Sequence, residues 1–492
     1  MASVPSTRRS RRPALKLGVV LGMALVLAGT GAGWVVWQGR PLGQDMRIDG
    51  DRQDASRPWP TATAQPTPEG PPYVTAVGAS GRYFLDQYGK PILVKGDSPW
   101  ALMTRLSPSQ ARLWFTDRQK QGFNAAIVSL IGALGNGGPS SDGSTFDGLR
   151  PFIGGDILKW QEPYWERVTS YLRMAADHGI TVMLYPVDGW TIGRSFVPQS
   201  FAQCRDYGRK VATRFRDLPN IVWMSGGDYF PATKDLARGS DVDSCIDAMM
   251  RGIRDMGDGR PFSMQLGFDK SISTDNPYWA DRVDWNFVYT YYPTYVAVLE
   301  AHSHQPGMPA VLGEANYEGE NNQPESLPTT DETLRRQALW ALTSGAAGEF
   351  VGSDDWEFHD GWQQRLSTPA LTQIRRLRDL FSRLPWWRLV PDSEHTLVTR
   401  GRGTQLTTDK AMDVLDNDYV TAAQTSDGRF AVIYLPTRHT ISVNRAALRA
   451  DIRAAWIDPT SGTRRPVPMQ STFTPPGTNA GGDADWLLVL TS

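Results

Sequence analysis

The chain has 492 residues, too many for one ordinary hydrophobic core, so we expect more than one folded domain. Its 51 basic and 52 acidic side chains give a formal net charge of −1, which argues against the basic surface of a nucleic-acid-binding protein. A hydrophobic content of 40% and a charged content of 21% exclude a disordered chain.

The N-terminal region has the pattern of a segment that enters a membrane. Residues 1–16 carry five basic side chains and are predicted to form a cytoplasmic tail. Residues 17–37 are uncharged, mostly apolar and long enough to span a bilayer, which takes about 20 residues. A signal-peptide core is shorter, about 7–15 residues, so a transmembrane signal-anchor is favoured over a cleaved signal peptide. We therefore expect an extracytoplasmic protein anchored to the membrane, or a secreted one if the segment is cleaved.

Residues 38–72 contain seven prolines and few apolar side chains, which predicts an extended, proline-rich linker. From residue 73 the pattern changes, and a small β-hairpin is expected at residues 73–89, below the main domain.

Residues 73–390 alternate short apolar runs with amphipathic stretches. The predicted strands lie at residues 92–95, 125–130, 181–185, 221–224, 262–266, 285–289, 310–312 and 349–352. The predicted helices between them include residues 107–121, 164–178, 200–215 and 241–256. This α/β alternation, repeated about eight times, favours a (β/α)8 TIM barrel over a doubly wound sheet. The chain also lacks a glycine-rich phosphate loop after any strand, which weakens a dinucleotide-binding interpretation.

Two of the predicted strands end on a lone carboxylate, Asp228 after the fourth strand and Glu314 after the seventh. The carboxyl ends of barrel strands form the catalytic face. Two carboxylates that converge there are the pair that glycoside hydrolysis requires. The structural alternatives are that Asp228 caps a following helix and that Glu314 pairs with an arginine.

Other acids and aromatic residues gather at the same strand ends, as a sugar-binding pocket requires. The predicted substrate-binding residues are Asp97, Trp100, Asp188, Trp190, Tyr289, Tyr291, Asn316, Tyr317 and Trp356. With two cysteines and six histidines that show no HxxxH spacing, we expect neither a metal site nor a cofactor. Cys204 and Cys245 either form one disulfide outside the cytoplasm or stay free, because their separation cannot be read from sequence.

Residues 391–492 have the composition of an all-β domain. Strands are predicted at residues 431–435 and 486–490, and residues 456–462 form a turn between strands. We therefore expect a small β-sandwich after the barrel.

Four motifs resemble the apiosidase-like glycoside hydrolases, a family of (β/α)8 enzymes that act on plant or microbial polysaccharides. They are KGDSPW at residues 95–100, EPYW at 162–165, WMSGGD at 223–228 and GEANYE at 313–318. The resemblance implies that Asp228 is the acid/base, that Glu314 is the nucleophile, and that a β-sandwich of the collagen-binding type follows the barrel. One departure is the end of the fifth strand, where relatives often carry His-Pro and residues 263–267 read SMQLG.

The sequence therefore predicts a glycoside hydrolase that cleaves a polysaccharide or oligosaccharide by a two-carboxylate, retaining mechanism. The alternative from another class is a non-catalytic cell-surface protein that binds polysaccharide or matrix.

Overall fold

The computed structural model describes residues 70–196, 199–229, 241–267, 270–320, 329–407 and 412–492. Within these ranges no helix has both the length and the apolar character needed to cross a bilayer. The predicted tail at 1–16 and membrane span at 17–37 lie outside the described residues, as does the linker at 38–72 except for its last three residues.

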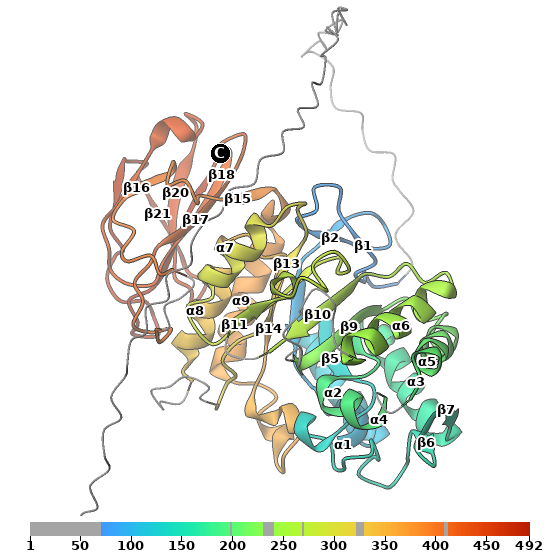
Figure 1. The fold of residues 1–492 in the computed structure, drawn as a ribbon. Helices are drawn as coiled ribbons and strands as arrows, with labels where there is room; N and C mark the ends of the chain where they lie inside the picture. The colour runs from blue at the N-terminus through green and yellow to red at the C-terminus, as the bar shows by residue number, and fades with distance from the viewer. Residues whose placement is uncertain (1–69, 197–198, 230–240, 268–269, 321–328, 408–411) are drawn as a thin grey trace, which may run out of the picture. The chain divides into compact units, whose positions relative to one another are not determined.

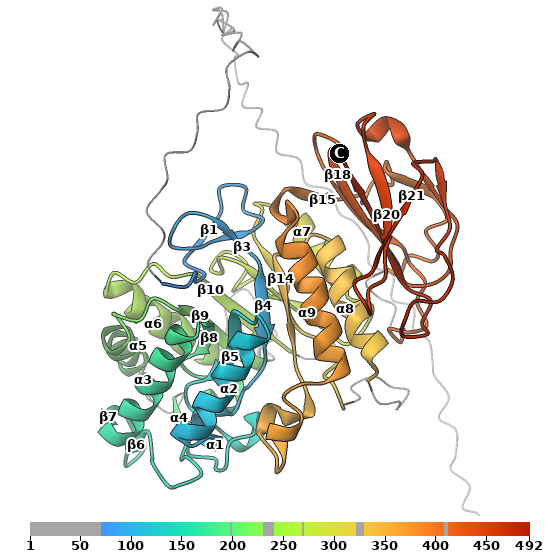
Figure 2. The ribbon, with the colours of Figure 1, turned by 180° about the vertical axis from the view of Figure 1, so that it is seen from behind.

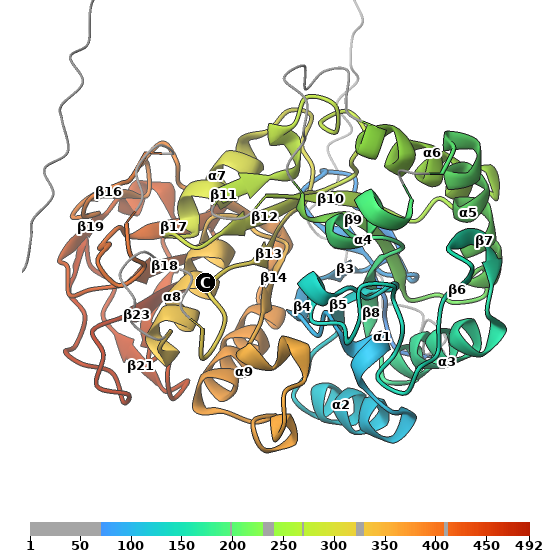
Figure 3. The same ribbon diagram turned by 60° about the horizontal axis from the view of Figure 1, so that its bottom comes forward.

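A barrel of parallel strands surrounded by helices forms the larger part of the described chain (Figures 1 and 3). The sheet order is β10-β9-β8-β5-β4-β14-β13-β12-β11, and only β11, at one end, is antiparallel to its neighbour. The parallel strands are β4 Val94–Asp97, β5 Ala125–Ser129, β8 Thr181–Tyr185, β9 Ile221–Tyr229, β10 Phe262–Leu266, β12 Asn286–Thr290, β13 Ala310–Glu314 and β14 Gly348–Val351. The short β11 is Lys270–Ile272. The predicted TIM-type barrel is therefore confirmed.

Seven outer helices are described, and the first four begin and end within two residues of the predicted bounds. They are α2 Pro108–Lys120, α3 Glu162–Asp177, α5 Phe201–Arg214, α6 Asp241–Asp255, α7 Tyr295–Ser303, α8 Asp331–Thr343 and α9 Pro369–Ser382. Ser107 caps α2 in a capping box with Gln110, and Pro108 occupies the first helical position. Gly122 and Gly179 follow the ends of α2 and α3 at φ of 78° and 71°, the left-handed conformation that ends helices.

The two ends of the sheet meet between β10 and β12, where serine side chains bridge the strands. The Ser263 hydroxyl donates to the carbonyl of Trp285 at 2.6 Å. The Ser273 hydroxyl donates to the carbonyl of Met264 at 2.7 Å and accepts from the amide of Phe287 at 2.8 Å. These side chains satisfy buried backbone groups that the strand ladder leaves open, so the barrel is nearly closed.

A small three-stranded sheet covers the N-terminal ends of the barrel strands, as the sequence predicts. It consists of β1 Ala76–Val77, β2 Phe84–Leu85 and β3 Pro91–Ile92, so the expected hairpin gains a third strand. The amide of Val74 donates to the Thr181 hydroxyl at the start of β8. The Phe84 ring packs edge-on against Trp285, just before β12, at 5.7 Å between centroids.

Cys204 on α5 and Cys245 on α6 form a disulfide, with their Cα atoms 5.5 Å apart. The sequence left this pairing open. Because disulfides persist mainly in oxidising compartments, the bond is in keeping with the predicted export, which itself stays a prediction.

The C-terminal region is an all-β domain of two antiparallel sheets (Figure 2). The larger sheet has the order β15-β17-β18-β23-β20-β21 and the smaller β16-β19-β22. The larger sheet contains β15 Leu389–Pro391, β17 Thr421–Thr425, β18 Phe430–Leu435, β20 Arg453–Ile457, β21 Arg464–Val467 and β23 Trp486–Thr491. The smaller contains β16 Val398–Arg400, β19 Ile441–Val443 and β22 Thr472–Phe473. A core that includes Ile433, Trp456, Phe473 and Leu488 draws on both sheets, as in a sandwich.

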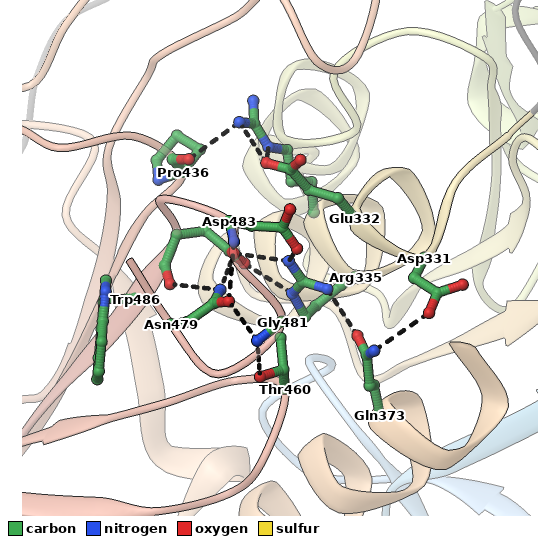
Figure 4. A network of polar contacts seen from close by, with 12 residues as sticks. Asp331, Glu332, Arg335, Gln373, Pro436, Thr460, Asn479, Gly481, Asp483 and Trp486 are labelled. Carbon is green, nitrogen blue, oxygen red and sulfur yellow. Dashed lines mark hydrogen bonds and ion pairs between the residues drawn. The ribbon is translucent and has the colours of Figure 1, made fainter. Parts of the chain in front are cut away.

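The barrel and the β domain share helix α8 as a buried layer. Figure 4 shows Arg335 on α8 pointing to Asp483 of the β domain and to Gln373 of α9. Arg336 donates to the carbonyl of Pro436, and the Trp340 indole N–H donates to the carbonyl of Tyr419. The buried face of α8 therefore carries charged as well as apolar side chains. Its two arginines, Arg335 and Arg336, form hydrogen bonds with groups of the β domain.

Candidate active site

A pocket of about 180 Å³ opens at the carboxyl ends of the barrel strands. Its lining joins carboxylates to aromatic rings. The lining residues are Trp100, Gly135, Asn136, Trp190, Gly227, Asp228, Gln265, Tyr289, Tyr291, Glu314, Tyr317, Glu320 and Trp356. The pocket thus brings together both predicted carboxylates and most of the predicted substrate-binding residues.

Strand β9 is longer than the predicted strand at 221–224, because it continues to Tyr229 through a bulge. Gln265 and Leu266 follow one another on β10, yet they pair with Gly226 and Tyr229 on β9. Two residues of β9 therefore have no partner on β10. Such bulges occur beside active sites, where they redirect a side chain.

The bulged residues have backbone angles that favour glycine. Gly226, Gly227 and Asp228 have φ of 96°, 82° and 49°. A Cβ atom on Gly226 would lie 1.8 Å from the carbonyl oxygen of Gln265, so only glycine fits there. Asp228 is a rare non-glycine residue at positive φ, a strain that surrounding structure must impose and that clusters at functional sites. The two glycines thus let β9 turn Asp228 toward the pocket.

Glu314 ends β13 and is held by hydrogen bonds rather than by an arginine. The Gln265 side-chain amide donates to its Oε2 at 2.9 Å, and the Tyr289 hydroxyl also bonds to it. Among the described residues no arginine forms an ion pair with Glu314.

Tyr289 on β12 lies beside both carboxyl groups: interaction with its hydroxyl lowers the pKa of each and opposes the effect of burial, and the same hydroxyl shares a 2.6 Å hydrogen bond with Tyr291. Burial raises the pKa of Asp228, and burial together with the charge of Asp228 raises the pKa of Glu314 well above its ordinary range. We therefore expect the pair to retain a proton at a pH where isolated carboxyl groups are ionised.

Two tryptophans that line the pocket pack against glycines of one short segment, η1 Leu134–Asn136 and the following Gly137. A Cβ on Gly135 would lie 2.4 Å from the Trp190 ring, and one on Gly137 would lie 3.0 Å from the Trp356 ring. Trp190 remains 49% exposed although its ring covers Gly135. The other face of this ring is thus available as a flat apolar platform at the pocket.

Three residues predicted as substrate contacts, Asp97, Asp188 and Asn316, do not line the pocket. Asp97 turns outward to helix α2, where it forms a buried ion pair with Arg118 at 2.5 Å. Asn316 donates to the carbonyl of Tyr291 at 2.8 Å and to the Gln337 side chain on α8 at 2.7 Å. Both side chains therefore hold the strand ends from outside the pocket, and the predicted substrate contacts need correction.

Asp188 is fully buried and its oxygens are occupied by the protein. It accepts from the Ser129 hydroxyl at 2.6 Å, from the backbone amides of Trp190 and Thr191, and from the Asn136 side chain. Burial raises the pKa of Asp188, although these hydrogen bonds oppose the shift. Asp188 therefore fixes the segments that carry Trp190 and Asn136, and the predicted direct contact needs correction.

The sequence analysis missed Asn136, Gln265 and Glu320 as pocket residues. Gln265 did carry a signal, because it lies in the SMQLG stretch at residues 263–267 that departs from the family pattern. Glu320 lies just beyond the GEANYE motif and accepts the indole N–H of Trp356 at 2.7 Å. Asn136 gave no signal, because its segment lies far in sequence from both carboxylates.

Comparisons with known proteins agree with this architecture. Residues 79–388 match the family described as "Apiosidase-like, catalytic domain", and residues 407–491 match "Putative collagen-binding domain of a collagenase". No curated protein matches the chain.

Solved structures with the same fold include a glycoside hydrolase family 5 protein from Bacteroides vulgatus ATCC 8482. It is 19% identical with a TM-score of 0.72, over 85% of this chain and 94% of that one. A second, named only as a glycoside hydrolase, is 19% identical with a TM-score of 0.70, over 85% of this chain and 97% of that one. At such identities the likeness shows a shared fold. Because the catalytic-domain match spans residues 79–388, well over half of the chain, this protein belongs to the apiosidase-like family.

Proposed function

We propose that this protein is a retaining glycoside hydrolase in which Glu314 is the nucleophile and Asp228 the general acid/base. The observation that carries the proposal is that Asp228 and Glu314 line one aromatic pocket, close enough for the charge of Asp228 to raise the pKa of Glu314. Retaining enzymes hold two such carboxyl groups ~5–5.5 Å apart and inverting enzymes ~6.5–9.5 Å apart, so the anomeric configuration of the product distinguishes the two mechanisms.

The surroundings of the two groups support the division of roles. Glu314 receives hydrogen bonds from Gln265 and Tyr289, which favour its ionised form. The Oδ1 atom of Asp228 is buried and has no hydrogen-bond partner among the described residues. A protonated Asp228 gains a partner when the glycosidic oxygen of a substrate arrives.

The reaction then follows the two-step course of retaining glycosidases. Glu314 attacks the anomeric carbon while Asp228 protonates the departing oxygen, so that a glycosyl ester forms on Glu314. Asp228, now ionised, takes a proton from water, and this water releases the sugar with its original anomeric configuration. The coupled pair holds one proton between its two carboxyl groups, and because Glu314 accepts the hydrogen bond from Gln265, the proposal assigns that proton to Asp228 for the first step.

The decisive experiment incubates the purified protein with plant and microbial cell-wall polysaccharides and their oligosaccharides. Proton NMR then follows the anomeric signals of new reducing ends. We expect cleavage of at least one glycan and a first-formed product that retains the substrate's configuration. An inverted product would contradict the roles proposed here. Binding without cleavage across the panel would instead favour the non-catalytic alternative.

The platform formed by Trp190 gives a further prediction. Gly135→Ala is expected to displace the Trp190 ring, because the new methyl group would overlap it. Loss of a well-placed aromatic contact, worth about 1–1.5 kcal/mol, should weaken substrate binding roughly 10-fold. The value of KM for a cleaved oligosaccharide measures this effect. Gly259→Ala is the matched control, since a Cβ there meets no atom within 4 Å. Equal KM values for the two variants would refute the platform.

A further inference from the structure

Three buried side chains from three barrel strands form a chain of hydrogen bonds that ends on Glu314. The Tyr185 hydroxyl on β8 donates to Oε1 of Gln265 on β10 at 2.7 Å. The Gln265 amide group then donates from Nε2 to Oε2 of Glu314 on β13 at 2.9 Å. Tyr185 and Gln265 are almost fully buried, so water does not compete for these bonds.

The direction of this chain is fixed by the chemistry of its ends. An ionised carboxylate only accepts hydrogen bonds, so the amide must present its N–H to Glu314 and its oxygen to Tyr185. Burial and the nearby charge of Glu314 raise the pKa of Tyr185 well above its ordinary value, so its hydroxyl remains a donor. The hydrogen bond from Gln265 therefore lowers the pKa of Glu314 and opposes the upward shift caused by burial and by the charge of Asp228.

Gln265 is itself held firmly on both sides. Its backbone carbonyl occupies the space that a side chain on Gly226 would need, at the start of the β9 bulge. Its partner Tyr185 packs against Trp100 with ring centroids 5.0 Å apart, and the Trp100 indole N–H donates to the Tyr317 hydroxyl. Gln265 thus contacts both the strand that carries Asp228 and the side chain of Glu314.

We propose that Gln265 is a positioning residue that fixes the orientation of the Glu314 carboxyl group and favours its ionised form, with Tyr185 fixing Gln265 in turn. This inference rests on the nucleophilic role proposed for Glu314. Unlike a histidine, the amide carries no titrating proton of its own, so it donates to Glu314 at every working pH.

The first test needs no substrate. The protein is labelled with 13C at the δ carbon of glutamate, and the Glu314 signal, assigned by its loss in Glu314→Gln, is followed through a pH titration. Gln265→Met keeps the length of the side chain and removes the donor. It is expected to raise the pKa of Glu314, because one hydrogen bond to the charged form is lost. Gln265→His restores an N–H and should return the titration toward that of the wild type.

Tyr185→Phe provides a milder variant that leaves Gln265 in place. It should shift the Glu314 titration in the same direction by a smaller amount, since the amide loses its anchor and not its N–H. Gln119→Met, on the exposed face of α2, is the control and should leave the titration unchanged. An unshifted Glu314 signal in both Gln265→Met and Tyr185→Phe would overturn the proposal.

The second test uses an oligosaccharide that the wild type cleaves. Gln265→Met should lower kcat by up to about 100-fold with little change in KM, because a misplaced nucleophile still allows binding. The acid limb of its kcat/KM profile should move to higher pH, since Glu314 then ionises at higher pH. A loss that is equal at every pH would mean a merely structural role and would overturn the proposal. If the variants shift the Glu314 titration as expected but the wild type cleaves no glycan, the proposed function is contradicted. The link from Gln265 to Glu314 then still stands.

Discussion

Glu314→Gln is expected to reduce hydrolysis to the background rate, because an amide does not form the glycosyl ester through which the retaining reaction proceeds. The barrel should stay folded, since the new amide oxygen can still accept from Gln265 and Tyr289. The measurement is kcat on a glycan that the wild type cleaves, with Glu394→Gln, an exposed residue of the β domain, as the matched control. Turnover within about 10-fold of the wild type would exclude Glu314 as the nucleophile.

Asp228→Asn is expected to show a different pattern, which separates the acid from the nucleophile. Loss of a general acid lowers kcat by about 10²–10⁴-fold on natural glycans. The loss should be much smaller on an aryl glycoside of the same sugar with an acidic phenol, because that leaving group departs without a proton. Asp451→Asn, exposed in the β domain, is its control. Equal losses on both substrates would assign Asp228 another role.

The same pair predicts how stability depends on pH. Burial and the charge of Asp228 raise the pKa of Glu314 in the folded protein, so the folded state binds this proton more tightly than the unfolded state does. The stabilisation is complete below the unfolded pKa of about 4.3 and is lost as the pH rises toward the folded pKa. Glu314→Gln removes this penalty. Its melting temperature should therefore exceed that of the wild type at pH 8, and the difference should shrink toward pH 4.

The barrel could be predicted because its signals are local. Apolar runs that end on turn residues, a serine cap before Pro108, and glycines after the ends of helices all act within a few residues. The two carboxylates were also found, since each stands at the end of such a run. The β9 bulge was not, because it depends on register with β10 and on the close approach of Gln265 to Gly226.

The errors in the predicted site have one physical origin. A strand end delivers side chains inward and outward in turn, and sequence alone does not say which of them faces the pocket. Asp97 faces outward and pairs with Arg118, a buried arginine on the otherwise apolar stripe of α2. That buried arginine is the signal that could have identified Asp97 as structural, because a charge on such a stripe needs a partner. Asn136 offers no comparable signal.

The interface between barrel and β domain centres on one ion pair. Arg335 and Asp485 are both 0% exposed, and the guanidinium donates to the two carboxylate oxygens at 2.8 and 2.6 Å. Asp483 and Gln373 each accept one further N–H group of the guanidinium (Figure 4). Burial alone would lower the pKa of Arg335, but the bonds to Asp485 raise it, so the arginine stays charged.

Arg335→Met is expected to lower the free energy of unfolding by about 3–5 kcal/mol, because it leaves the Asp485 charge buried without its cation. The double variant Arg335→Met, Asp485→Leu should recover much of this loss, since no unpaired charge remains. Urea unfolding measures both, with Arg464→Met, an exposed arginine of β21, as the control expected to change little.

Because α8 also carries Gln337, which bonds Asn316 beside Glu314, the Arg335→Met variant should lose activity at a lower urea concentration than the wild type. If Arg335→Met and the wild type unfold with the same urea midpoint, the β domain does not stabilise the catalytic strands through this ion pair.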